Sequence, residues 1–178
     1  MQSSKHINQI PIITLMSFLF PYLTFGQDKN QKEIYTIIRV VINNINPKIP
    51  IVDSLHTTVF KNEFHITQIK NKISLTSKQK EILKKGIKND LGLLIDKNYL
   101  KEFNFYSYKD VIKRFQNINH EVNSEKKSYY LLSKPLFFNN NTIAILNVDL
   151  IRGFGAIYIL KKEGENWRII GEIGRWYS

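Results

Sequence analysis

The chain has 178 residues and no cysteine, with 26 Lys and Arg against 15 Asp and Glu, so its formal net charge is +11. This length indicates about one domain, and 43% hydrophobic residues are too many for a disordered tail. The lack of cysteine excludes a disulfide framework, a thiolate metal site, a cysteine nucleophile and a lipoprotein cysteine. The composition therefore predicts a globular protein that is stabilised without covalent cross-links.

Residues 1–26 have the pattern of a signal peptide. A short polar segment precedes the mostly apolar residues 10–25, and Thr24 and Gly26 supply small side chains at the expected cleavage point. A membrane anchor is the alternative, but two prolines interrupt the apolar run, which is shorter than the roughly 20 residues that cross a bilayer. We expect cleavage after Gly26 and a single secreted or periplasmic domain, residues 27–178, without a membrane span.

Three amphipathic helices are expected after this segment. Apolar side chains recur every three or four residues in 29–44, 76–89 and 107–118. Thr76 and Gln79 have the spacing of a capping box at the start of the second helix, and the third begins with the same spacing. Each apolar stripe should face a common core.

Two less regular segments lie between these helices. Residues 49–60 and 64–75 are rich in β-branched residues and predict one or two strands. Asp96 is expected to cap a short turn that carries Tyr99.

The last third of the chain changes its period from about 3.6 to 2. Four strands are expected at residues 129–138, 142–150, 156–162 and 167–176. Short turns rich in Asn and Gly separate them, which favours an antiparallel meander. The predicted fold class is α+β, with N-terminal amphipathic helices packed on a C-terminal four-stranded antiparallel meander sheet. Leu146 and Trp167 should lie in its core.

This last third also carries a family resemblance. Its markers are Ser133, Lys134, Pro135, Leu136, Phe137, Ala144, Gly153, Gly155, Lys161, Lys162 and Trp167. They resemble small secreted, mostly uncharacterised proteins common in Bacteroidota. In that pattern the glycine-rich loop often carries cysteines, which are lacking here, so the departure weakens a metal or redox role. The resemblance implies a location and a fold type.

The candidate ligand loop consists of Asp149, Arg152, Gly153 and Gly155. Two glycines let backbone amides approach a ligand, and the Arg152 guanidinium is a fork for carboxylate or phosphate, with Asp149 as its expected partner. The alternative is a bulged hairpin in which the glycines serve only a tight bend.

The candidate basic face consists of Lys78, Lys84, Lys85 and Lys88. Such a face attracts polyanions, although it is also what an ordinary solvated helix face looks like in a lysine-rich chain. Arg, which binds phosphate in a bidentate manner, is scarce beside Lys, so nucleic acid is an unlikely partner.

Catalytic signatures are lacking. The sequence contains no nucleophile elbow and no phosphate-binding glycine loop, and His56, His65 and His120 have no metal-ligand spacing. Asp53 and His56 are expected on opposite faces of an extended segment, with the imidazole on the surface. We therefore predict no catalytic residue, no cofactor and no metal.

Two classes of function fit these observations. The first is an exported, non-catalytic binding or interaction module that presents its outer sheet face, with Ile145 and Tyr158, or its basic face to a protein or cell-surface partner. The second is a small envelope enzyme that uses carboxylate and His groups in a cleft between sheet and helices.

Overall fold

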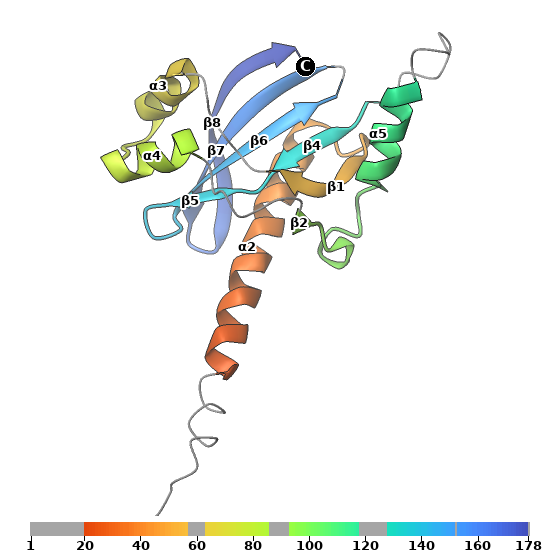
Figure 1. Ribbon diagram of the computed structural model, residues 1–178. Coiled ribbons are helices and arrows are strands. Elements are labelled where there is room, and N and C mark those ends of the chain that lie inside the picture. Colours follow the sequence, from red (N-terminus) through yellow and green to blue (C-terminus); the bar gives the residue numbers. More distant parts are fainter. Residues whose placement is uncertain (1–19, 57–62, 86–92, 118–127, 152, 178) are drawn as a thin grey trace, which may run out of the picture. The chain divides into compact units, whose positions relative to one another are not determined.

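The structure is a computed structural model that describes residues 20–56, 63–85, 93–117, 128–151 and 153–177 (Figure 1). The chain divides into two compact units, residues 1–33 and 34–178. None of the helices described is both long enough and apolar enough to cross a membrane.

The second unit combines helices with one sheet. In the described part of the chain the helices are α2 (Phe20–Ile45), α3 (Glu63–Lys72), α4 (Ser77–Lys85) and α5 (Tyr108–Asn117), with the 3-10 turn η1 (Lys97–Tyr99). The strands are β1 (Ile51–His56), β2 (Leu93–Leu94), β3 (Phe105–Tyr106), β4 (Tyr130–Ser133), β5 (Leu136–Phe138), β6 (Ile143–Leu150), β7 (Phe154–Glu163) and β8 (Asn166–Tyr177). The fold is therefore α+β, as predicted.

The sheet is larger than predicted and mixed. Its eight strands follow the order β2-β1-β4-β6-β7-β8, with β3 also beside β1 and β5 beside β6. The strands from β4 to β8 pair antiparallel, but β1 is parallel to β3 and β4. The prediction of a four-stranded antiparallel meander is wrong, because β1 comes from the helical half of the chain and joins the sheet through long-range pairing that no local pattern specifies.

The predicted strand 129–138 is divided into β4 and β5. Lys134 and Pro135 separate the two pieces, and proline cannot donate a ladder hydrogen bond. Both pieces still pair with β6.

The interpretation of residues 64–75 as part of one or two strands is wrong, because most of this segment forms α3. Ile66, Ile69 and Ile73 are buried, and their spacing of three and four residues matches one face of a helix. They pack with Leu83 of α4 against one face of the sheet. The β-branched composition was the misleading signal, since helical spacing together with tertiary packing outweighs the modest helix penalty of Ile.

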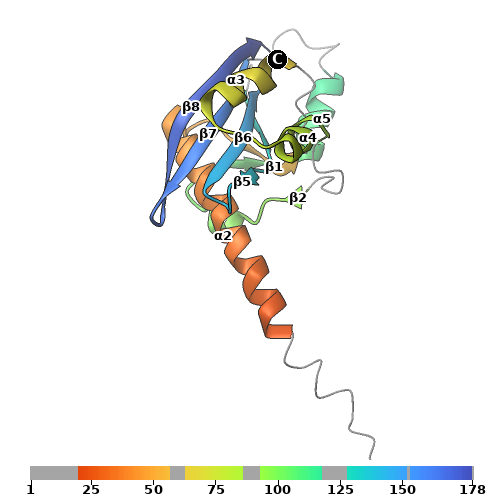
Figure 2. The same cartoon turned by 90° about the vertical axis from the view of Figure 1, so that its left-hand side faces the viewer.

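Helices cover both faces of the sheet. Alternate residues of β6 divide between two core clusters: Ala144, Leu146 and Val148 belong to the cluster of α2, whereas Ile143 and Ile145 belong to that of α3 and α4. Figure 2 shows α2 and α3 at the sheet from a second direction.

Two predictions about buried residues have opposite outcomes. Leu146 and Trp167 are 0% and 5% exposed, which confirms their place in the core. The prediction that Ile145 and Tyr158 form an exposed outer face is wrong, because they are 0% and 1% exposed. The layer of α3 and α4 covers Ile145, whereas Tyr158 pairs with Leu146 and lies in the cluster of α2 on the opposite face.

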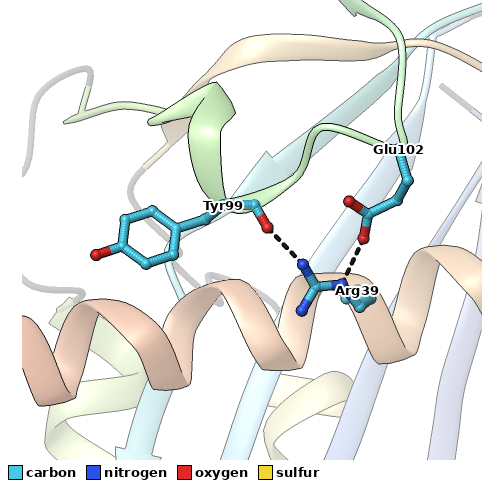
Figure 3. A network of polar contacts seen from close by, with 3 residues as sticks. All are labelled: Arg39, Tyr99 and Glu102. Carbon is cyan, nitrogen blue, oxygen red and sulfur yellow. Dashed lines mark hydrogen bonds and ion pairs between the residues drawn. The ribbon is translucent and has the colours of Figure 1, made fainter.

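Polar contacts from α2 fasten the segment that contains η1. The Tyr35 hydroxyl accepts the Asp96 N–H at 2.7 Å, and the Tyr35 and Tyr99 rings stack with centroids 4.6 Å apart. The Arg39 guanidinium donates to the Tyr99 carbonyl and pairs with Glu102 (Figure 3). The hydrogen bond from Arg39 to the Glu102 carboxylate is the main reason why the pKa of Glu102 lies below its ordinary value. The segment is thereby held as the partner of β1.

Two of the three predicted caps are confirmed by side-chain hydrogen bonds. The Gln79 N–H donates to the Thr76 hydroxyl oxygen at 3.3 Å, and the Thr76 N–H donates to Gln79 Oε1 at 2.8 Å. The Asp96 carboxylate accepts the Asn98 N–H at the start of η1. These are local interactions that sequence spacing anticipates well.

Candidate functional site

A pocket of about 620 Å³ lies where β1, β2 and the first turn of α5 meet. Its lining residues, which define the β1–α5 pocket, are Asp53, Ser54, His56, Leu94, Ser107, Tyr108 and Lys109. This volume is in the range of small-molecule sites.

An irregular stretch of β1 shapes this pocket. Between Ile51 and Leu55 the pairing of β1 with β4 shifts its register. Such a bulge changes the direction of side chains relative to a regular strand. Asp53 and His56 consequently line the same pocket, and the prediction that simple alternation would separate them is wrong.

Asp53 acts as a tertiary cap for α5. One carboxylate oxygen accepts the Tyr108 N–H at 3.0 Å, and the other lies 3.4 Å from the Lys97 ammonium. Helix N-terminal amides have no partner within the helix, so a carboxylate from another element stabilises them. Asp53 therefore joins β1 to α5, and its charge is balanced by Lys97.

His56 is partly buried, so the expectation of a surface imidazole is wrong. Its ring lies against the Tyr108 ring, with centroids 5.5 Å apart. Burial lowers the pKa of His56 from its ordinary 6.5, and the nearby Asp149 charge opposes this shift to a smaller extent. The Nε2 atom is buried and has no hydrogen-bond partner in the described structure. His56 is accordingly a neutral imidazole at physiological pH.

A polar strip continues from His56 across the next two strands. Ser133 is paired in register with His56, and its hydroxyl accepts the Asn147 N–H at 2.9 Å. The Asn147 amide nitrogen donates to Asp149 at 2.8 Å, which sets the amide orientation, since the flipped amide would put two acceptors together. Asn147 and Asp149 are two residues apart on β6 and so share a face of the strand, but the period-2 pattern of 142–150 does not indicate their proximity to His56.

The candidate ligand loop is only partly within the described structure. Asp149 lies near the end of β6, opposite Gly155 of β7, and the Gly153 N–H donates to the Leu150 carbonyl at 2.8 Å. Arg152 lies outside the described residues. The pairing of β7 with β8 shifts register just after Gly155. The pairing of β6 with β7 keeps one register up to Asp149 and Gly155, so the shift belongs to β8 rather than to this hairpin, and a ligand role for the loop stays a prediction.

The candidate basic face is partly neutralised. Lys84 pairs with Glu63 and Lys85 with Glu81, each at 2.5 Å. Lys78 is exposed on α4, and Lys88 lies outside the described residues. Pairing of two of the four lysines reduces the charge that the face offers to a polyanion.

The other histidines do not add to the site. His65 lies on α3, and His120 lies outside the described residues. Among the residues with a described position, no three His, Asp or Glu side chains are grouped closely enough to hold a metal ion.

Comparisons with known proteins provide no relative. No protein-family model matches the chain, and no curated protein and no solved structure is significantly similar to it. The fold and the pocket thus define an α+β domain with a ligand-sized pocket at the junction of β1, β2 and α5.

Proposed function

We propose that this protein is an exported, non-catalytic binding module that takes a small ligand in the β1–α5 pocket. The observation that carries the proposal is the convergence of seven side chains from three separate segments on one pocket. Concave sites that combine apolar walls with a few polar groups are the usual form of a small-molecule site. Export is supported by the signal-peptide pattern of residues 1–26.

The polar groups of the pocket favour binding over catalysis. Both carboxylate oxygens of Asp53 are engaged, one with the Tyr108 amide and the other with Lys97. In the part of the chain that the structure describes, His56 Nε2 has no hydrogen bond to a hydroxyl that it would activate. A general base needs a proton donor within hydrogen-bond distance, whereas a binding site needs only a stable arrangement of polar groups.

A ligand screen by protein-detected NMR tests the proposal. Mixtures of small metabolites should shift the amide resonances of the pocket segments, residues 53–56, 94 and 107–109. The Tyr108→Ala variant should weaken this binding. The matched control is Phe154→Ala, which removes an exposed aromatic side chain at a separate 310 Å³ cavity and should leave the binding unchanged. Shifts confined to other segments, or no binder in the whole screen, would refute the proposed pocket.

One observation favours the second candidate, a small envelope enzyme. His56 is neutral and therefore competent as a base, and the Asp149 charge acts on it. Turnover of a panel of esters, amides and glycosides by the protein, lost in His56→Gln, would select this candidate over the binding module. We expect no turnover above the buffer rate.

A further inference from the structure

We infer that the β1–α5 pocket selects an amphiphilic anion, a small molecule with an apolar or aromatic body and one carboxylate. This inference rests on the proposed function, because it names the ligand class of the same pocket.

The apolar body is indicated by exposed side chains at the pocket. Leu94 and Tyr108, which line it, are 70% and 42% exposed, although large apolar side chains are usually buried. Ile112, at 37%, lies one turn beyond Tyr108 on α5, and Leu93, at 43%, precedes Leu94 on β2. Four of the six exposed large hydrophobic residues in the described structure therefore belong to these two elements. Apolar surface gathered around a concave site is typical of a ligand-binding region.

The anionic head is indicated by the balance of charge. Asp53 is the acidic residue of the lining, and Lys97 and the Tyr108 amide already compensate it. Lys109 is exposed at the same pocket and forms no ion pair with any described residue. Among the described residues that line the pocket, the uncompensated charge is therefore positive. A carboxylate neutralises this charge, while an ammonium group adds to it.

The neighbouring charges do not reverse this balance. Asp110 is exposed on the first turn of α5, and Lys113 is exposed one turn further along, so their charges offset each other. Asp149 carries a charge that acts on His56, but it is not among the residues that line the pocket. Among the described lining residues, Lys109 is thus the lysine that is available to a ligand.

Three probes with the same body test the inference: 3-phenylpropanoate, 3-phenylpropan-1-ol and 3-phenylpropylammonium. Their dissociation constants are measured by NMR titration of the protein at physiological salt. We expect the carboxylate to bind tightest and the ammonium weakest, and the shifts of all three to map to the pocket segments. Lys109→Gln should weaken the carboxylate by about five-fold, the upper range of an exposed ion pair, and leave the alcohol unchanged.

Two variants serve as controls. Lys113→Gln removes the same charge from the same helix outside the pocket lining and should not change the affinity for the carboxylate. Tyr108→Ala should weaken all three probes by a similar factor, because it removes part of the apolar wall that they share. A well-dispersed amide spectrum verifies that each variant is folded.

The outcomes separate the ligand class from the proposed function. If the alcohol or the ammonium binds at the pocket as tightly as the carboxylate, or Lys109→Gln has no effect, the inference is overturned and the pocket remains a binding site. If none of the probes shifts the pocket resonances, the inference is also overturned. The proposed function then fails as well if the wider metabolite screen finds no binder.

Discussion

Burial sets the charge of His56, and this couples its protonation to stability. The folded protein holds the pKa of His56 below the 6.5 of an unfolded chain, mainly through loss of hydration. Between these two pKa values the unfolded chain binds more protons than the folded protein. Above pH 6.5 His56 is neutral in both states and does not lower the free energy of unfolding. This free energy decreases as the pH falls from 6.5 through the folded-state pKa, because protonation then favours the unfolded chain.

A pH series of urea unfolding curves measures this linkage. From about pH 8 to about pH 5 the free energy of unfolding should decrease more steeply in the wild type than in His56→Gln, which cannot be protonated in this range. The difference between the two proteins isolates His56 from the other titrating groups. Parallel curves would mean that His56 is as well hydrated in the folded protein as in the unfolded chain.

Leu146 and Trp167 allow a test of the core at the level of single side chains. Truncation of either to Ala should lower the free energy of unfolding by about 2–5 kcal/mol, because burial is lost and a cavity is left. Trp167 also loses an edge contact with Phe137, whose ring centroid is 6.0 Å away. Leu93→Ala, at an exposed position, is the control and should cost less than about 0.5 kcal/mol. Losses below about 1 kcal/mol for both core variants would contradict the observed sheet register.

At the scale of elements, the capping box shows how local spacing defines the start of α4. Replacement of Thr76 by Ala removes the hydroxyl that accepts the Gln79 N–H and should cost about 1 kcal/mol. The exposed Ser74, two residues earlier, provides the control Ser74→Ala, for which we expect no measurable loss. Chemical denaturation measures both values, and equal losses would show that the hydroxyl of Thr76 is dispensable.

The edges of the sheet are modified in ways that discourage pairing with another chain. On one side the edge is made of β2 and β3, which have two residues each. On the other side β8 has two register shifts in its pairing with β7 and carries the exposed Arg168 and Glu172. Short strands, bulges and charges all make a poor template for an added strand. This supports the pocket, rather than a sheet edge, as the contact region.

At the scale of the whole molecule, the positive net charge predicts weak and salt-sensitive attraction to polyanions. Heparin should bind weakly at low salt and much less at physiological salt, because neutralised phosphate or sulfate groups release counterions. The Lys84→Ala, Lys85→Ala double variant should behave almost like the wild type, since both lysines already have acidic partners. Titration of labelled protein measures this. A large loss in the double variant would establish the basic face as a binding site.

Export is a separate prediction for the whole chain. The protein recovered from the cell envelope or the medium should begin at Gln27, because Thr24 and Gly26 complete the signal-peptide pattern. Mass spectrometry of the intact protein determines its first residue. Retention of Met1 in that fraction would refute cleavage.

Features that depend on neighbouring residues could be predicted from the sequence. These include α2 from residue 29 onward, α4 and α5, the two caps and the alternation of β6. The turn at Asn139, Asn140 and Asn141 is another, since all three have positive φ values that Asn tolerates better than most residues. Each of these depends on hydrogen bonds or side-chain periodicity within a few positions, so the spacing of residue types is sufficient to indicate it.

Other features were decided only by tertiary structure. The parallel pairing of β1 with β4 joins distant segments, and the same irregular stretch of β1 places Asp53 and His56 in one pocket. Coverage of the second sheet face, which buries Ile145, requires α3 to pack where a strand was expected. The sequence by itself determined the elements because their energies are local. The sheet order, the buried imidazole and the pocket depend on which distant surfaces exclude water together, and this is decided only when the chain packs.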